Sequence, residues 1–381
     1  MGVINFLATA IPLVTIEKWG WLGWILRWIQ GGVVNAAWTM VIFTLIIKLV
    51  TFPLDFYSRY KMKKNAVIME DLKPVLEKLQ KQCKGDKTMY NQRMYPMLKK
   101  EGYSTFGACL PTLVTLALFI FIFSGLNTYA TARNADIYNR MVETYNYHTL
   151  TADEYNALED PSGRYYIDTK DAGADVYDVS TEAGKTAVDE LLVKRYDELN
   201  PSWLWVKNPW RPDVAYSEKL GIFSFVAPAQ SVATYREFTD GKFGIRGIKG
   251  ENVDEAVGIN NYNKVMGAVS ADKGTNNGLY ILIVLAVGIS FFSQWLMQKT
   301  QQASNQDMAG CMGKGTMKFM LILFPIMMGF FAFSYTSVFT LYIITNSLFT
   351  TGSTFLINYI VGVQMKKLQE KKLAAVKYRR Y

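Results

Sequence analysis

Five apolar stretches, each near the length that crosses a bilayer as a helix, alternate with polar stretches along this chain of 381 residues. A helix needs about 20 apolar residues to cross the hydrocarbon core. The last two stretches are separated only by a tight break around Ser334 to Ser337, so we expect them to form an antiparallel pair. The pattern predicts an all-α membrane protein. The five predicted transmembrane helices occupy residues 34–57, 105–128, 279–299, 316–335 and 337–361.

The N-terminal segment, residues 1–33, ends in a pattern typical of an amphipathic helix at a membrane surface. Over residues 17–31, three tryptophans share one helical face, and small or polar residues share the other. Tryptophan is enriched at the headgroup level. The alternative is a further hydrophobic hairpin over residues 1–30, and residues 1–16 are either a trimmed signal or a retained segment. The tryptophans are Trp21, Trp24 and Trp28, opposite Gly20, Gly23, Arg27 and Gly31.

Residues 58–104 predict a helical hairpin between the first two spans. Apolar residues with a three-four spacing make one stripe on the first arm, and a polar turn at Lys81 to Lys87 leads to a second arm. Two solvated helices packed on each other would explain this pattern. A basic hairpin would also suit anionic lipid headgroups, ribosomal RNA or an acidic targeting receptor. The stripe consists of Met62, Ala66, Met69, Leu72, Leu76 and Leu79, continued by Met94, Met97 and Leu98.

Charge is unevenly distributed, and this orients the predicted spans. Residues 58–103 carry 12 Lys and Arg against 5 Asp and Glu (+7), and residues 362–381 carry 7 against 1 (+6). Residues 129–278 carry 16 against 23 (−7). Since basic segments remain in the cytoplasm, we expect the N-terminus outside, with the hairpin, the loop 300–315 and the basic tail 362–381 inside. These features predict a multi-pass protein of a bacterial inner (plasma) membrane.

The acidic segment 129–278 then lies outside, and we expect an extra extracytoplasmic domain of mixed secondary structure there. Apolar residues at helical spacing predict a helix within Thr181 to Leu199. Three tryptophans further along should return the chain to the outer membrane surface. They are Trp203, Trp205 and Trp210.

The chain has few of the residues that common hydrolases use. It has three cysteines, whose spacing matches no metal site, and one histidine, His148. A zinc site or a Ser-His-Asp triad would therefore need unusual ligands or bases. No GxxxxGK[ST] run marks a nucleotide site. We expect neither an enzyme nor a cofactor.

Lys48 is the most informative residue in the chain. It lies inside the first predicted span, roughly 13 Å before Tyr57 at a rise of about 1.5 Å per residue. A lysine at the centre of a lipid-exposed helix costs about 2.5–3.5 kcal/mol. Lys48 follows a four-three-four spacing with Thr44, Thr51 and Asp55, which places all four on one helical face. Snorkelling to the headgroups would span about two turns, further than the side chain reaches. We therefore expect this face to meet a wet or polar interior.

Other predicted spans carry polar groups that could share this interior. Serine and threonine often bond their own backbone in membrane helices, so each alone is weak evidence. The amides Gln294 and Asn346 cannot satisfy themselves in that way and are stronger candidates. The candidate polar site consists of Lys48, Thr44, Thr51, Thr112, Thr115, Gln294, Tyr342 and Asn346.

Several short motifs follow one another in a recognisable order. They are Thr44-Leu-Ile-Ile-Lys-Leu-Val-Thr-Phe-Pro-Leu54, Leu72-Lys-Pro74, Gly107-Ala-Cys-Leu-Pro111, Trp205-Val-Lys-Asn-Pro-Trp210, Gln294, and Leu341-Tyr342 with Asn346. In this order they resemble the YidC/Oxa/Alb family of membrane protein insertases. The resemblance is to the five-helix form of Gram-positive bacterial members, and this chain has in addition an enlarged extracytoplasmic loop. Members of that family most often have arginine where this chain has Lys48, glutamine at Thr115 and a second proline at Ala117.

The resemblance implies a groove among five helices, open to the cytoplasm and to lipid and closed towards the outside. Lys48 would attract acidic residues in the arriving polar segment of a client, whose apolar helix would leave along the third and fifth spans. The implied partners are nascent membrane proteins and membrane lipid. The ribosome, the signal-recognition-particle receptor and the Sec translocon are candidates, and no small-molecule substrate is implied.

Two other classes of function compete with this interpretation. A small-solute or ion transporter would explain an intramembrane lysine, but it predicts repeated halves and broken spans at matching positions. The sequence has neither. A membrane-anchored enzyme would place its chemistry in residues 130–277, where acidic residues are plentiful but are expected on any solvated surface.

Overall fold

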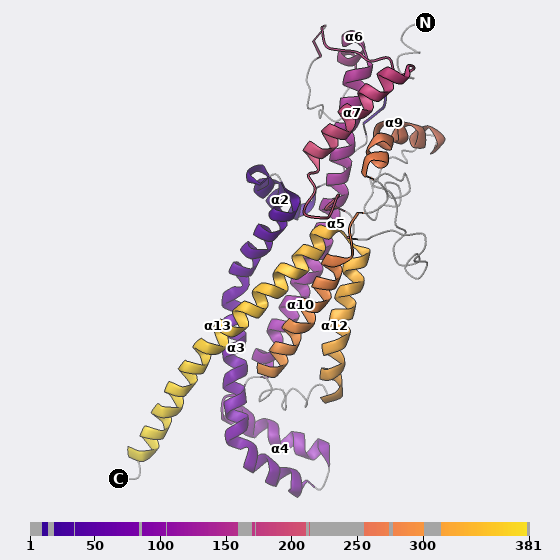
Figure 1. Ribbon diagram of the computed structural model, residues 1–381. Helices are drawn as coiled ribbons and strands as arrows, with labels where there is room; N and C mark the ends of the chain where they lie inside the picture. The colour runs from indigo at the N-terminus through magenta and orange to yellow at the C-terminus, as the bar shows by residue number, and fades with distance from the viewer. Residues whose placement is uncertain are drawn as a thin grey trace. The chain divides into compact units, whose positions relative to one another are not determined.

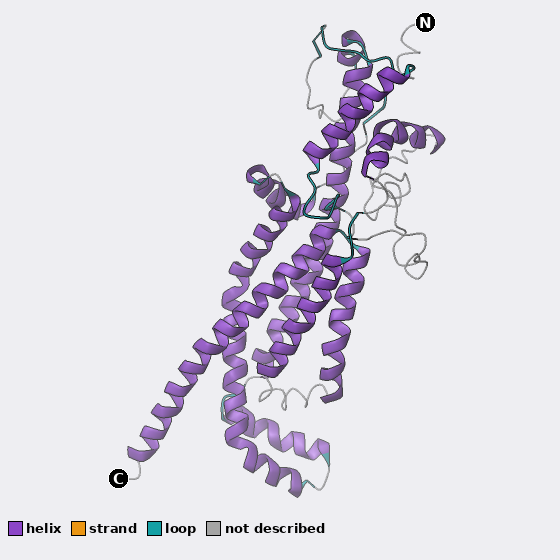
Figure 2. Ribbon diagram, in the orientation of Figure 1, coloured by secondary structure: helices purple, strands orange, loops and turns teal. Residues whose placement is uncertain are grey.

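The computed structural model describes a helical protein. The described residues are 10–13, 19–33, 35–83, 86–103, 105–158, 170–171, 173–210, 213, 255–273, 277–300 and 314–378. Within these ranges every regular element is a helix (Figures 1 and 2), which confirms the all-α prediction. The helices are α2 (Gly20–Gly32), α3 (Ala36–Gln82), α4 (Lys87–Lys100), α5 (Thr105–Thr149), α6 (Ala152–Asn156), α7 (Glu182–Leu199), α9 (Glu255–Lys273), α10 (Ile281–Thr300), α12 (Lys314–Ser334) and α13 (Ser337–Tyr378).

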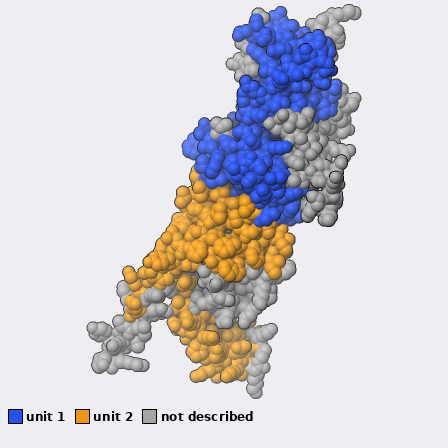
Figure 3. All heavy atoms as spheres, viewed as in Figure 1, with its two compact units in different colours: residues 1–43, 122–284, 329–342 blue, residues 44–121, 285–328, 343–381 orange. Residues whose placement is uncertain are grey.

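The chain divides into two compact units (Figure 3). Helices α3, α5, α10, α12 and α13 each contribute residues to both. Unit 1 contains most of α5 together with α2, α6, α7 and α9, and unit 2 contains most of α3 and α13 together with α4. Unit 1 comprises Met1–Phe43, Ile122–Val284 and Gly329–Tyr342, and unit 2 comprises Thr44–Phe121, Leu285–Met328 and Ile343–Tyr381.

The five predicted spans fall on α3, α5, α10, α12 and α13. Of the helices in the described residues, α3 is long and apolar enough to cross a membrane by length and composition, with a mean hydropathy of 1.9 over its best 18-residue window. Shorter apolar stretches lie at Ile281–Met297 in α10 and Ile322–Phe333 in α12. The number of spans therefore stays a prediction. The break between the fourth and fifth is present, and the Thr336 hydroxyl caps α13 by accepting a hydrogen bond from Phe339 N at 3.3 Å.

The predicted hairpin is formed in unit 2, and its first arm continues the first span without interruption. α3 is one helix of 47 residues that contains both Pro53 and Pro74. α4 follows after a short turn, with the Asp86 carboxylate accepting hydrogen bonds from Thr88 N at 2.9 Å and Met89 N at 3.1 Å. The two arms pack through the predicted stripe. Its buried centre is Leu76, Leu79 and Cys83, packed against Met69, Leu72, Tyr90, Met94 and Met97.

The region expected outside the membrane is helical, rather than mixed, in its described residues. α5 extends to Thr149, well beyond the predicted end of the second span at residue 128. It continues because its buried positions keep a helical spacing in this extension, as at Tyr138, Val142 and Tyr145. Residues 214–254, where further secondary structure was expected, lie outside the described residues.

Two further helices complete this region of unit 1. The predicted helix within 181–199 is α7, which begins with the Thr181 hydroxyl accepting a hydrogen bond from Gly184 N at 3.1 Å. It packs against α9. Tyr262 of α9 in turn stacks on Tyr138 of α5, with ring centroids 5.7 Å apart. A helical layer around α5 therefore forms the described part of this domain.

The N-terminal helix α2 is present with its three tryptophans outward, but its second face is not the one expected. Gly20, Arg27 and Gly31 are exposed like the tryptophans, and an apolar face is buried instead. Leu22, Leu26 and Ile29 are buried, whereas all three tryptophans on the other face are exposed. Gly125 of α5 lies directly beneath: a Cβ added there would come within 3.1 Å of the Leu22 side chain. The small residue thus permits close packing of α2 on α5, with the tryptophan face left outward.

A polar clasp, made by Asp213 and the residues it binds, holds the start of α10. The Asp213 carboxylate is fully buried and accepts hydrogen bonds from Leu279 N at 2.8 Å, Leu282 N at 2.6 Å and Trp205 Nε1 at 3.2 Å. Gly278 makes this approach possible, since a Cβ at that position would lie 1.6 Å from the carboxylate. The clasp joins the tryptophan loop, which runs from Trp203 to Trp210, to the first turn of α10.

Two asparagines extend this connection. Asn208 N donates to Asn277 Oδ1 at 2.7 Å, and Asn277 Nδ2 donates to Asn208 O at 3.0 Å. Next to them, Val338 N of α13 donates to Pro209 O at 3.0 Å. The motif from Trp205 to Trp210 therefore ties the first turns of α10 and α13 to one loop in unit 1.

Candidate functional site

The predicted polar face of α3 lies in unit 2, where its side chains are only partly enclosed. Thr44 is fully buried, and Lys48 and Thr51 are half-buried. The Thr51 hydroxyl donates to the Lys48 carbonyl at 3.4 Å, so part of its polarity is satisfied within the helix. By contrast, Leu49 and Val50 are exposed on α3, at 65% and 75%. One side of this helix is thus strongly apolar and outward, and Lys48 lies on a more enclosed side.

α13 packs along α3 and runs in the same direction. Phe52 meets Phe349 edge to face with ring centroids 6.5 Å apart, and further along, Ile357 and Val361 pack against Phe56, Tyr60 and Val67. Phe52 pairs with Phe349, and the two helices rise equally per residue. Lys48, four residues before Phe52, therefore lies level with about residue 345 of α13. The packing therefore places the candidate residues Lys48 and Asn346 at a similar level along the two helices.

α10 contacts α13 at this same level. The hydroxyls of Ser290 and Ser347 are 3.3 Å apart, and the Ser293 hydroxyl donates to the Ser347 carbonyl at 3.5 Å. Gln294 directly follows Ser293 and is half-buried, as is Asn346 beside Ser347. The two predicted amides therefore flank one contact between helices. Ser293 and Ser347 were missed as participants, because a serine in an apolar helix gives no sign of whether it bonds its own backbone or a neighbouring helix.

Other threonines of α13 have the modest role expected of isolated hydroxyls. Thr350 donates to the Asn346 carbonyl at 2.7 Å, Thr351 to the Ser347 carbonyl at 2.8 Å, and Thr354 to the Thr350 carbonyl. These bonds satisfy the hydroxyls within the helix. The candidate groups of the polar site at this height along the helices are therefore Gln294, Asn346 and Lys48.

The remaining candidates are placed differently. Thr112 and Thr115 lie on α5, and their side chains are outside the described residues. Tyr342 belongs to unit 1, where it is buried and its ring stacks on Phe339 with centroids 6.0 Å apart. Phe339 in turn meets Phe123 of α5 at 5.4 Å. The contacts of Tyr342 are those of a packing residue that helps join α5 to α13.

Comparison with known proteins gives a family for the chain. The family model described as "60Kd inner membrane protein" matches residues 28–156 and 241–367. A protein of Aromatoleum aromaticum named "Membrane protein insertase YidC" is 37% identical over 115 residues, which are 28% of this chain and 20% of that protein. Proteins of the same name from Jannaschia sp. and Campylobacter jejuni are 33% and 29% identical, over 28% and 29% of this chain and 17% and 22% of their own lengths.

These alignments span about a fifth of the relatives' length. No solved structure matches the chain. The family match covers α3, α4, α5 and α6, and also α9, α10, α12 and most of α13. It leaves out residues 157–240, which include α7 and the tryptophan loop.

Proposed function

Because the chain belongs to the 60Kd inner membrane protein family, we propose that it is a membrane protein insertase, as its relatives are named. The observation that carries this proposal is the family match over the helices that hold Lys48, Gln294 and Asn346. We also propose that the chain crosses the membrane five times. It would act without a cofactor or a small-molecule substrate.

Lys48 is the centre of the proposed mechanism. Its half-buried side chain lies level with Asn346, beside helices whose other faces are apolar. A cation in a medium of low polarity attracts an opposite charge far more strongly than it does in water. An acidic residue in the polar segment of a client would therefore be drawn into a hydrophilic groove at Lys48, and the hydrophobic distance left to cross would shorten.

The client's apolar helix would leave along the third and fifth spans, which are α10 and α13. Exposed apolar side chains support this route, among them Phe291 and Trp295 on α10 and Phe355 and Tyr359 on α13. Transfer of such a helix into lipid is favourable by about 25 cal/mol per Å² of apolar surface. That transfer would drive insertion without a nucleotide.

The proposed clients are nascent membrane proteins. The hairpin of α3 and α4 presents exposed basic residues such as Lys78, Lys81 and Arg93 on its outer faces. They suit the phosphates of a ribosome or of anionic lipid, or an acidic targeting receptor. The ribosome, the signal-recognition-particle receptor and the Sec translocon are the partners that we propose on this basis.

Reconstitution of the full chain into liposomes tests the function. We expect a small client with one apolar helix and a short acidic tail to insert, with the tail becoming protected from added protease. Empty liposomes are the control. If the client inserts equally well into both, and the protein instead conducts ions or solutes, the transporter interpretation replaces this one.

The proposed orientation places the hairpin in the cytoplasm. The native Cys83 is a poor reporter because only 4% of it is exposed. Gln82, its exposed neighbour, is better: in a chain whose three cysteines are replaced by alanine, Gln82→Cys should react with an impermeant maleimide only in inverted vesicles. Asp171→Cys, in the predicted outer domain, should react only in intact cells. Labelling of Gln82→Cys from outside would reverse the topology.

A further inference from the structure

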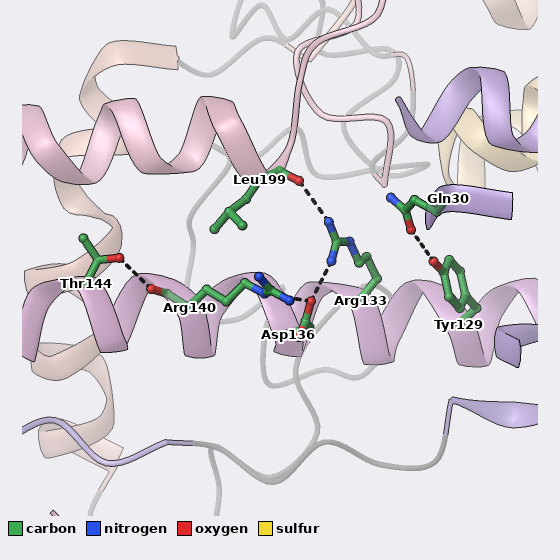
Figure 4. Close-up of polar contacts among 7 residues, drawn as sticks. All are labelled: Gln30, Tyr129, Arg133, Asp136, Arg140, Thr144 and Leu199. Carbon is green, nitrogen blue, oxygen red and sulfur yellow. Dashed lines mark hydrogen bonds and ion pairs between the residues drawn. The ribbon is translucent and has the colours of Figure 1, made fainter. Parts of the chain in front are cut away.

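A small pocket in unit 1 has no part in the proposed insertion mechanism. It lies between α2 and α5, beside the C-terminal end of α7, with a volume of about 250 Å³. Three arginines line it, from two helices: Arg27 on α2, and Arg133 and Arg140 on α5. Figure 4 shows the two arginines of α5 directed toward the same carboxylate. Such a concentration of guanidinium groups in one cavity requires an explanation.

The carboxylate between them is Asp136, which is almost fully buried. Arg133 Nη1 lies 2.6 Å and Arg140 Nε 3.3 Å from the same oxygen, Asp136 Oδ2. Arg133 Nη2 also donates to the Leu199 carbonyl at the end of α7, at 3.0 Å. One carboxylate thus holds two guanidinium groups in place. The network fixes the positions of these cations beside the pocket.

The other acidic side chain in the lining pairs with an arginine outside the lining. Glu198 Oε2 is 3.0 Å from Arg195 Nη1, so its charge is already matched by a fourth arginine. Arg27 is exposed, and its guanidinium lies over the Trp19 ring at 4.6 Å from the centroid. This stacking orients a planar cation at the pocket without a carboxylate. The three lining arginines therefore exceed the two lining carboxylates by one charge, before Arg195 is counted.

Neutral groups on the pocket wall add hydrogen bonding without adding negative charge. The Tyr129 hydroxyl donates to Gln30 Oε1 at 2.7 Å. Burial raises the pKa of Tyr129 to about 12, so the phenol stays protonated at physiological pH. Arg133 Nε is buried and has no hydrogen-bond acceptor among the described residues, although the other nitrogens of that guanidinium are bonded. One buried N–H donor of a pocket-lining arginine therefore has no acceptor among the described residues.

The helix that carries Arg27 also indicates where the pocket lies. Trp21, Trp24 and Trp28 of α2 are 50%, 77% and 73% exposed, a large apolar surface for a face turned towards water. Tryptophan prefers the boundary between headgroups and acyl chains. A pocket beside this helix would lie at the level of the lipid phosphates, on the face that we expect to be outside.

We propose that the pocket between α2 and α5 binds a phosphate group, with Arg27 and Arg133 as its main donors. Guanidinium matches phosphate because its parallel N–H groups can contact two oxygens at once. The phosphate would belong to the headgroup of an anionic phospholipid such as phosphatidylglycerol, or would be free inorganic phosphate. The site is separate from Lys48, so it stands or falls independently of the insertion mechanism.

Native mass spectrometry of the full chain in a neutral detergent tests the proposal. The probes are short-chain phosphatidylglycerol, short-chain phosphatidylcholine and inorganic phosphate. We expect phosphatidylglycerol to bind more tightly than phosphatidylcholine, and Arg27→Gln to weaken its binding about tenfold, the usual effect of losing one charged hydrogen bond. Arg27→Lys should retain much of the binding because the charge remains. Arg27 is exposed, so neither change should unfold the protein.

Lys194→Gln is the matched control, since it removes one exposed positive charge from α7 in the same unit. It should bind phosphatidylglycerol as the unmodified protein does. Competition by inorganic phosphate that depends on Arg27 would mean that free phosphate also occupies the pocket. Phosphatidylglycerol binding that inorganic phosphate does not reduce would assign the pocket to lipid. Equal binding of the two lipids, or an unchanged affinity in Arg27→Gln, would overturn the proposal.

Discussion

Two lysines, one in each unit, show how differently the two parts of this protein use polar groups. Lys170 in unit 1 is 3% exposed, and its ammonium group donates to the Tyr147 carbonyl and, at 2.7 Å, to the Leu150 carbonyl. It thereby caps the C-terminal end of α5, where a positive charge is favourable. Lys48 in unit 2 is half-buried on a helix face beside apolar surface. The first lysine is buried and bound at a helix end, and the second is partly exposed.

The same contrast extends to the neighbouring groups. The buried carboxylates of unit 1 each bind several groups. Asp136 binds two arginines of its own helix, and Asp213 accepts bonds from the start of α10. In unit 2 the hydroxyls of α13 mostly bond their own helix. Unit 1 uses these polar groups to fix structure, whereas Lys48, Gln294 and Asn346 of unit 2 are only partly buried. Substitutions should therefore lower stability in unit 1 and change client handling in unit 2.

The largest effect is expected at the clasp in unit 1. Asp213→Ala leaves two backbone N–H groups and an indole N–H without their buried acceptor, at a cost on the order of 3 kcal/mol. Gly278→Ala should destabilise similarly by driving a methyl group into the carboxylate. Thermal unfolding in detergent measures both, and exposed Asp171→Ala is the control. An unfolding temperature unchanged in Asp213→Ala would show that the clasp contributes little.

The next effect concerns Lys48, and it should appear in activity. Lys48→Met should reduce insertion of a client with Asp or Glu in its translocated segment about tenfold, while a neutral version of that client suffers less. This is the effect of losing one charged contact. Lys48→Arg should retain most activity because the charge remains, and Lys48→Glu should be worst for acidic clients.

Lys170→Met provides the counterpart that sharpens this comparison. It should lower the unfolding temperature, because the carbonyls at the end of α5 lose their donor. Its remaining activity should not depend on the charge of the client. Equal insertion of the acidic client by the native and Lys48→Met proteins would end the electrostatic mechanism and leave the family assignment intact.

A smaller effect is expected at the hairpin. Lys78→Gln combined with Lys81→Gln should weaken binding of ribosome–nascent-chain complexes several-fold at low salt, since each lost contact to phosphate reduces the salt dependence of binding by about one unit. Co-sedimentation at two salt concentrations measures this. Lys185→Gln combined with Lys194→Gln on α7 is the charge-matched control. If both pairs bind ribosomes as the native protein does, the hairpin does not recruit them electrostatically.

The smallest effect is a pH dependence in unit 1. Burial, together with the positive charge of Lys170, lowers the pKa of His148 below its ordinary value, against a weaker opposing influence of Asp175. The folded protein thus holds this imidazole neutral. As the pH falls below about 6.5, the unfolded chain takes up the proton first and stability decreases, until the pH passes the lowered pKa. Above that range the contribution is constant.

His148→Gln should remove part of this loss of stability in acid. Unfolding temperatures measured between neutral and mildly acidic pH would reveal the difference, with the native protein falling more steeply. Parallel curves for the two proteins would assign the acid sensitivity to other groups.

The sequence by itself determined the elements whose signal is local. The three-four spacing from Met69 to Leu79 predicted the hairpin arms that pack in unit 2, and the apolar periodicity after Thr181 predicted α7. The same kind of pattern predicted the helix α2 and its exposed tryptophans, although not the buried face formed by Leu22, Leu26 and Ile29. The family also followed from motif order, which the family model confirms. These features depend on neighbours within one or two turns, which the chain displays directly.

The tertiary structure alone decided which distant groups meet. Nothing near Asp213 predicts that its carboxylate binds the first turn of α10, 69 residues later, at Leu282 N. Likewise, no local pattern predicts that Arg27 and Arg133 line one pocket, or that Tyr342 packs in unit 1. The chemistry of a side chain determines which bonds it can form. Only the packing of helices decides which partner comes within reach, because burial energy depends on shape over the whole unit.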